Sequence, residues 1–231
     1  MSAAPRVKVC CIGSVDEARQ AVAAGAAALG LVSAMPSGPG VIDDERIAEI
    51  AAAVRGLPVR TFLLTARVEA EAIAEQHARA GTTTLQLVDE VPHEELRRLR
   101  RLRPGVELVQ VVHVAGEASV DEALAVLPYV DALLLDSGNP ALAVKELGGT
   151  GRTHDWALSR RIRDAVHPRP LWLAGGLRAH NVAEAVAAVR PHGLDLCTGV
   201  RSEGRLDGTK LAGFMQALLT PGGTPPAAAR P

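Results

Sequence analysis

Residues 7–13, with the sequence VKVCCIG, decide the fold class of this chain. The run is short, apolar and rich in β-branched residues, and a turn signal at Gly13-Ser14 closes it, which is typical of a buried strand. Because side chains alternate along a strand, we expect it to have two distinct faces. One face would carry Lys8, Cys10 and Ile12, and the other Val7, Val9 and Cys11.

Similar apolar runs alternate with Ala-rich or charged segments along the rest of the chain. The predicted strands are residues 7–12, 27–33, 58–64, 82–87, 105–112, 130–135, 170–174 and 194–197. The predicted helices are residues 15–25, 43–54, 69–80, 94–102, 120–127, 155–165, 181–189 and 210–219. Strands that are apolar on both faces indicate a parallel sheet, and eight strand–helix units favour a closed (β/α)8 TIM barrel over an open doubly wound sheet. Residues 13–16 also lack the spaced glycines of a dinucleotide-binding loop.

The length and composition fit one domain. The chain has 231 residues, 48% of them hydrophobic, and we expect a single barrel domain over residues 1–220. Residues 221–231 are rich in Pro, Gly and Ala and are expected to form a disordered tail. The formal net charge of −1 argues against nucleic acid as a partner, because phosphate backbones require a concentrated basic surface.

Two further features of the sequence bear on the cellular compartment and on whether a metal is bound. Residues 1–8 lack the apolar core of a signal peptide, and no apolar run is long enough to span a membrane. Three cysteines, two of them adjacent, provide neither a disulfide framework nor the paired spacing of a metal site. We therefore expect a cytoplasmic protein without a metal and without a membrane partner.

In a barrel of this type the carboxyl ends of the strands carry the chemistry, and two groups stand there. Cys10 lies near the end of the first strand, although a small core residue would have the same sequence signature. Asp136 ends the apolar run LLLD and could be either a desolvated acid with a raised pKa or the first residue of a turn.

Glycines mark the ends of the seventh and eighth strands. Gly175-Gly176 and Thr198-Gly199 follow these strands, where barrels frequently bind phosphate through backbone N–H groups. The alternative is that these glycines only allow tight turns between strand and helix. The sequence favours a phosphate site, because both loops have glycine at the expected place.

Together these motifs resemble the phosphoribosylanthranilate isomerase family, and the resemblance covers residues 7 to about 218. VKVCCIG is similar to the family's opening VKICGIT, and VDALLLD is similar to its sixth strand. GGTGRTHDW at residues 148–156 resembles GGTGxTxDW, LAGGL followed by Asn181-Val182 matches LAGGLxxxNV, and LDLCTGV resembles VDxSSGV. These last motifs occur in the family's order and spacing, so the resemblance is specific.

The resemblance implies a barrel enzyme of tryptophan biosynthesis that uses no cofactor. Such an enzyme converts an N-linked aminoaldose phosphate to an aminoketose by an Amadori rearrangement. The family's base falls on Cys10, its acid falls on Asp136, and its substrate loop falls on Gly148, Gly149, Thr150 and Gly151. The implied partner is a small sugar phosphate, and a monomer and a homodimer are both compatible with the resemblance.

The departures from the family lie on the amine side of the expected site. Cys11 replaces a glycine, Gly40 replaces an arginine that faces the anthranilate carboxylate, and Val88 replaces a histidine. A lysine that is common near the end of strand five appears as Gln110. Arg67 and Arg201 are candidates to replace the missing arginine.

Three hypotheses follow from these departures. The first is a phosphoribosylanthranilate isomerase with a rearranged carboxylate contact, and the second is a paralogous sugar-phosphate isomerase that acts on a different amine. The third is a non-catalytic barrel that binds a phosphate ligand, which the presence of both Cys10 and Asp136 disfavours. Cys197 should lie near the first strand, where two neighbouring core thiols are favoured over a redox link.

Overall fold

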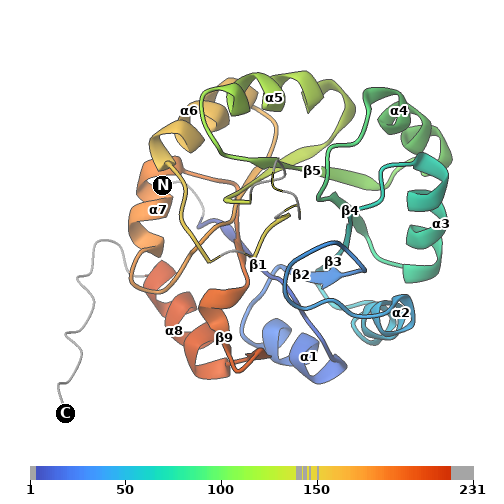
Figure 1. Cartoon of the computed structure of the whole chain (residues 1–231). Helices are drawn as coiled ribbons and strands as arrows, with labels where there is room; N and C mark the ends of the chain where they lie inside the picture. The colour runs from blue at the N-terminus through green and yellow to red at the C-terminus, as the bar shows by residue number, and fades with distance from the viewer. Residues whose placement is uncertain (1–3, 139–141, 143–144, 146, 150, 220–231) are drawn as a thin grey trace, which may run out of the picture.

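The computed structural model is a closed parallel barrel surrounded by helices, which confirms the predicted (β/α)8 TIM barrel (Figure 1). It describes residues 4–138, 142, 145, 147–149 and 151–219. The strands follow one another around the barrel in chain order from β1 to β8, and β8 pairs with β1 to close it. Thr150 and the predicted tail at residues 221–231 lie outside the described residues.

The strands and helices alternate as the sequence predicts. The barrel strands are β1 Arg6–Val9, β2 Ala28–Val32, β3 Arg60–Thr65, β4 Thr84–Leu87, β5 Glu107–His113, β6 Ala132–Asp136, β7 Leu171–Leu173 and β8 Gly193–Leu196. The helices are α1 Val15–Ala23, α2 Asp44–Ala53, α3 Ala70–Ala80, α4 His93–Leu102, α5 Ala118–Val126, α6 Trp156–Val166, α7 Val182–Val189 and α8 Gly208–Leu219. Two 3-10 turns, η1 Leu127–Tyr129 and η2 Thr198–Val200, and a small antiparallel pair, β9 Arg201–Ser202 and β10 Arg205–Leu206, complete the described structure.

Local signals in the sequence fix where several helices begin and end. The side chains of Ser14, Asp43 and Asp155 accept hydrogen bonds from backbone N–H groups at the start of α1, α2 and α6. These contacts satisfy N–H groups that have no partner within the helix. Gly81 ends α3 in a left-handed conformation that glycine adopts without strain.

The core has two layers. Apolar residues on the outer face of the strands pack against the helices, and a second cluster fills the barrel interior. Near the amino end of the interior, Phe62 and Trp172 form an edge-to-face pair with ring centroids 5.7 Å apart. The ammonium group of Lys8 lies 5.3 Å from the Phe62 centroid. Aromatic rings and a buried cation therefore form the floor beneath the carboxyl ends of the strands.

The predicted alternation of faces along the first strand is wrong beyond Cys10. Strand β1 ends at Val9, and Cys11 has a φ of 63°, the left-handed region that favours glycine. This turn places Cys11 in the interior cluster together with Cys10, whereas Ile12 packs in the outer layer. Both adjacent thiols consequently reach the same end of the barrel.

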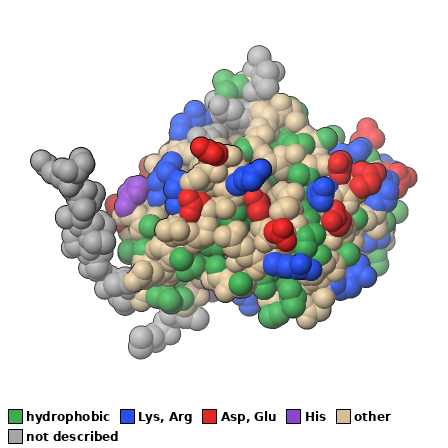
Figure 2. All heavy atoms as spheres, turned by 90° about the horizontal axis from the view of Figure 1, so that it is seen from below, with side chains coloured by type: hydrophobic (Ala, Val, Ile, Leu, Met, Phe, Trp, Pro, Cys, Tyr) green, Lys and Arg blue, Asp and Glu red, His purple; other side chains and the backbone are tan. Residues whose placement is uncertain are grey.

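Charged groups on the surface are mixed in sign. Figure 2 shows basic and acidic side chains interspersed on the face in view. On α4, for example, Arg98 forms ion pairs with Glu71 and Glu95. No helix among the described residues is long and apolar enough to cross a membrane.

Replacing Lys8 with Met should destabilise the protein by about 3–5 kcal/mol, because Asp195 would then be buried without its partner. Lys8 is fully buried, and its ammonium lies 2.7 Å from the Asp195 carboxylate across the β1–β8 seam. Urea unfolding would measure the loss. The control is Lys8→Met combined with Asp195→Leu, which removes both charges and should be closer to the wild type. A single variant as stable as the double would contradict this account.

Candidate active site

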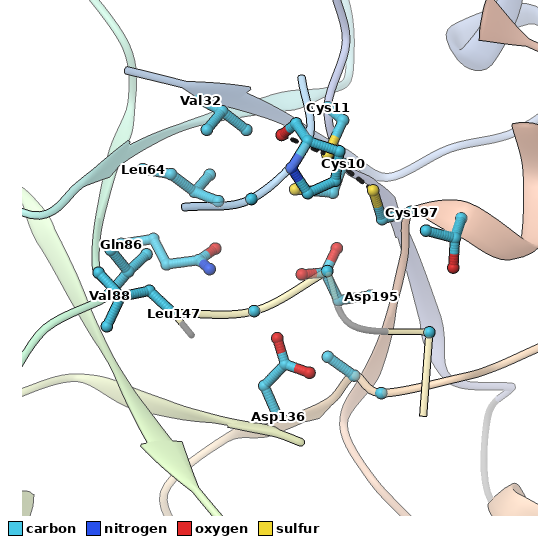
Figure 3. Close-up of a pocket in the computed structure, with 18 of the residues that line it drawn as sticks. Cys10, Cys11, Val32, Leu64, Gln86, Val88, Asp136, Leu147, Asp195 and Cys197 are labelled. Atoms are coloured by element: carbon cyan, nitrogen blue, oxygen red, sulfur yellow. Dashed lines mark hydrogen bonds between the residues drawn. The ribbon is translucent and has the colours of Figure 1, made fainter. Parts of the chain in front are cut away.

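A pocket opens at the carboxyl ends of the barrel strands, where the sequence predicts the chemistry (Figure 3). Loops that follow six strands contribute to it. The described lining residues include the predicted groups Cys10, Asp136, Gly148, Gly149, Gly151, Gly175, Gly176, Thr198 and Gly199. The fold therefore brings every described candidate residue to one place, from positions up to 189 residues apart along the chain.

Cys10 is only 6% exposed, and its thiol lies beside a cation. A methyl group placed on Gly30 of β2 would lie 2.7 Å from Cys10 Sγ and 3.1 Å from Lys8 Nζ, so both groups crowd the same glycine. Burial lowers the pKa of Lys8, but Asp195 more than offsets this and raises it to about 12. Lys8 is therefore a permanent positive charge next to the thiol.

The neighbouring groups favour the thiolate form of Cys10. A hydrogen bond from the Cys11 side chain lowers the pKa of Cys10, burial opposes this, and the Lys8 cation lowers it further. Hydrogen bonding to Cys10 and Cys197, together with burial, raises the pKa of Cys11. The opposite directions of these two pKa shifts make Cys10, rather than Cys11, the thiol that ionises first.

Cys197 follows β8 and lies against Cys11, with 2.7 Å between the two Sγ atoms. All three cysteines are free thiols. The structure therefore agrees with the prediction of neighbouring thiols at the junction of β1 and β8.

Asp136, at the end of β6, is the second titratable group that was predicted for the site. Burial raises its pKa to about 6, opposed by a hydrogen bond from the Ser137 backbone and supported by the nearby charge of Asp195. The Ser137 N–H lies 2.7 Å from Oδ1. A methyl group on Gly148 would lie 2.5 Å from Oδ2, so the loop after β6 passes directly over the carboxyl group. Close to neutral pH, part of the population carries a proton on this acid.

The two glycine-containing loops predicted to bind phosphate lie side by side. Gly175 and Gly176 have φ values of 82° and 61°. Any side chain on Gly199 would overlap the Leu177 carbonyl oxygen of the neighbouring loop. A methyl group on Gly151 would lie 3.3 Å from the Thr198 hydroxyl, which brings the loop after β6 to the same corner. Close backbone approach of this kind suits an anion held by N–H groups.

Neither arginine proposed as a replacement for the missing one points into the pocket. Arg201 donates to the backbone carbonyls of Cys10 and Cys11 and pairs with Glu17 at 3.3 Å, so it braces the end of β1. Arg67 lines a different surface hollow, next to α2. Both suggestions are therefore wrong as carboxylate contacts.

Two further positions that differ from the family, Val88 and Gln110, lie in different places relative to the pocket. Val88 lines the pocket. The Gln110 side-chain NH2 donates to the carbonyls of Leu87, Asp89 and Val111 at 3.1, 2.9 and 3.1 Å. Gln110 thus stabilises the end of β4 from behind the pocket.

Asp195 and Gly30 are parts of the site that the sequence reasoning missed. Asp195 lines the pocket and holds Lys8, and Gly30 leaves room for the Cys10 thiol. The available signal for Asp195 was a charged residue inside the apolar run LDL, since a buried carboxylate requires a partner. Nothing local distinguishes Gly30 from other strand glycines.

The fold and the position of this pocket define a (β/α)8 barrel of the kind that carries its active site at the carboxyl ends of the strands. The model of the N-(5'phosphoribosyl)anthranilate (PRA) isomerase family matches residues 7–217. An N-(5'-phosphoribosyl)anthranilate isomerase 2 from Methanosarcina mazei is 34% identical over 213 residues, covering 91% of this chain and 92% of the relative. The isomerase of Thermosynechococcus vestitus is also 34% identical, over 93% of this chain and 88% of the relative.

Solved structures show the same likeness. The phosphoribosyl anthranilate isomerase of Thermotoga maritima superposes with a TM-score of 0.79 at 29% identity, covering 93% of this chain and 98% of that one. A phosphoribosyl anthranilate isomerase in complex with reduced 1-(o-carboxyphenylamino)-1-deoxyribulose 5-phosphate superposes with a TM-score of 0.76 at 27% identity, over the same shares.

The chain belongs to the N-(5'-phosphoribosyl)anthranilate isomerase family. It is an aldose–ketose isomerase of the tryptophan-biosynthesis type that acts on a small phosphorylated substrate, as the sequence motifs predict. The reaction is an Amadori rearrangement of an aminoaldose phosphate to an aminoketose by general acid–base catalysis.

The Asp136 carboxyl should titrate with a midpoint near pH 6 in the ligand-free protein, because burial disfavours its charged form. Carbon-13 NMR of protein with labelled aspartate would follow the titration. The Asp136→Asn variant identifies the signal, which must disappear from its spectrum. A midpoint near the ordinary value of about 3.9 would contradict the desolvated environment.

Cys11→Ala should raise the pH at which Cys10 becomes reactive, because the hydrogen bond that favours the thiolate is lost. The pH dependence of iodoacetamide alkylation at Cys10, read by mass spectrometry, measures the shift. Both proteins should carry Cys197→Ser so that this thiol does not compete. An unchanged alkylation profile would show that Cys11 does not influence the ionisation of Cys10.

Proposed function

We propose that Cys10 is the general base and Asp136 the general acid of this isomerisation. The observation that carries the proposal is the opposite tuning of two groups that face one pocket. The pKa of Cys10 is lowered by Cys11 and Lys8, whereas burial raises the pKa of Asp136 to about 6. An Amadori rearrangement requires such a pair, one group to accept a proton and one to deliver it.

The steps follow from these roles. Asp136 donates its proton to the ring oxygen of the phosphoribosylamine, the bond between this oxygen and the anomeric carbon breaks, and the nitrogen lone pair forms an iminium ion. The Cys10 thiolate then removes the proton from the adjacent sugar carbon, which gives an enolamine. The former anomeric carbon then takes back a proton from the Cys10 thiol while the neighbouring enol hydroxyl gives its proton to the Asp136 carboxylate. This converts the enolamine to the ketone and returns both groups to their starting states, with no net gain or loss of atoms or electrons.

The remaining site residues bind and orient the sugar phosphate in this proposal. The backbone N–H groups at Gly175, Gly176 and Gly199, with the Thr198 hydroxyl, hold the phosphate at the ends of β7 and β8. Gly148, Gly149, Thr150 and Gly151 form the loop that covers the sugar, and the packing of Gly148 over Asp136 supports this role.

We also propose that the chain acts on a phosphoribosyl adduct of an amine, as the names of its relatives indicate for those proteins. A cytoplasmic location is consistent with three free thiols, one of them the proposed base. The non-catalytic alternative is disfavoured, because a protein that only bound phosphate would not need a buried thiol and a buried acid in the pocket.

Cys10→Ser and Asp136→Asn should each lower kcat by roughly 10²–10⁴-fold, the usual contribution of a general acid or base. The measurement is the rate of aminoketose formation from phosphoribosylamine substrates, including the anthranilate adduct, whose fluorescence is lost on isomerisation. Circular dichroism and thermal unfolding must show that the variants are folded. Wild-type rates in either folded variant would remove that residue from its proposed role.

A further inference from the structure

The half of the pocket opposite the phosphate corner is uncharged and mainly apolar. It is formed at the ends of β2, β3 and β4 and by the loop after β6. In Figure 3 the labelled side chains of this half lie across the pocket from Cys197, with Cys10 and Asp136 nearer to the middle. Its lining residues include Val32, Met35, Leu64, Gln86, Val88 and Leu147.

No described residue that lines the pocket, on either side, is Lys, Arg or His. The positions of the loop after β6 that are not described, residues 139–141, 143, 144, 146 and 150, also carry no basic residue in the sequence. The pocket instead contains two carboxyl groups, Asp136 and Asp195. A substrate carboxylate bound here would lose water without gaining a counter-ion among these lining residues, which is unfavourable in a buried site.

Several basic groups near the pocket are held by other partners. Lys145 pairs with Asp89 at 2.7 Å, and Lys8 pairs with Asp195 at the same distance. Arg201 is bound to Glu17 and to backbone carbonyls. His154, which lies beside Gly175, stays neutral because burial lowers its pKa to about 4.

The loop after β2 is packed so that position 40 cannot hold a side chain. Gly40 has a φ of 76°, and a methyl group on it would overlap Cys11 Cβ and lie 2.9 Å from Cys11 Cα. Cys11 Sγ also lies 3.5 Å from the Pro39 carbonyl oxygen. The Cys11 side chain, its Cα atom and the positive φ together exclude a basic residue from this loop position at the edge of the pocket.

One polar group faces the apolar half. Gln86 is 3% exposed, its amide points into the pocket, and its side-chain oxygen has no hydrogen-bond partner (Figure 3). A buried acceptor without a partner is costly, so a ligand with an N–H group at this point would gain from meeting it.

We propose that this enzyme is selective for phosphoribosylamines whose amine portion is neutral and apolar, such as an arylamine without a carboxylate, with Gln86 accepting a hydrogen bond from the amine N–H. The proposal rests on the isomerase function proposed above and specifies its substrate class. Cys11 and Gly40 act together as the specificity-determining pair, because the first excludes a cation from the position of the second.

The test compares the N-(5-phosphoribosyl) adducts of aniline and anthranilate, which differ only in the carboxylate. We expect kcat/KM to be roughly 10- to 100-fold higher for the aniline adduct, the range for a charged group left without its hydrogen-bond partner. Cys11→Gly/Gly40→Arg removes the closest contact at position 40, that with Cys11 Cβ, so that a small shift of the backbone admits the arginine, and it should reverse much of this preference. Cys11→Gly alone is the matched control and should leave the ratio between the two substrates unchanged.

A binding measurement separates this inference from the proposed catalysis. Calorimetry would compare reduced 1-(o-carboxyphenylamino)-1-deoxyribulose 5-phosphate with the same compound lacking the carboxyl group. Tighter binding of the carboxyl-free compound by a wild-type protein that isomerises neither adduct would support the inference while refuting the proposed function. Preference for the carboxylate in either assay, an unchanged ratio in the folded double variant, or binding of neither compound would overturn the inference.

Discussion

The ion pair between Lys8 and Asp195 joins the first and last strands of the barrel and also sets the electrostatics of the pocket. These residues are register partners on β1 and β8, the pair of strands that closes the sheet, and their charged atoms lie 2.7 Å apart. An ion pair in an interior of low polarity requires close geometry to offset the loss of hydration. A barrel with a shifted β1–β8 register would separate these charges. The ion pair therefore favours the observed register between the first and last strands. The same contact fixes the Lys8 cation beside Cys10.

Crowding at the end of β1 follows from this arrangement. The Cys10 thiol occupies the space that Gly30 leaves open, and Cys11 occupies the space that Gly40 leaves open. Arg201 holds the carbonyls of both cysteines from outside the pocket. Because Cys11 adopts a positive φ without being glycine, its backbone carries some strain, and these contacts hold it in place. The position of the Cys10 thiol thus depends on small residues of neighbouring segments.

Much of this structure could be predicted from the sequence, for reasons that are local. Strands buried on both faces appear as apolar runs, and Asp43 and Asp155 mark helix starts through their own side chains. Cys10 and Asp136 could be found because they end such runs. Cys11 was assigned to the wrong face, because nothing in the sequence signals a left-handed cysteine. The ion pair between Lys8 and Asp195 was also not predicted. The two residues are 187 positions apart in the chain, and they meet only because of the register in which β1 pairs with β8.

The phosphate corner and the amine half of the pocket differ in the groups that they offer to a ligand. This difference explains why the sequence indicated the phosphate corner but not the arrangement of the amine half. Backbone N–H groups are the proposed phosphate contacts, and their exposure requires glycine, so the sequence indicates this half directly at Gly175, Gly176 and Gly199. The amine is contacted by side chains, and their arrangement depends on packing between distant loops, as at Cys11 and Gly40. The proton transfers proposed for Cys10 and Asp136 involve only the sugar. A chain can therefore keep Cys10, Asp136 and the glycines after β7 and β8 while the amine half changes, and the departures at Cys11, Gly40 and Val88 lie at that half or its rim.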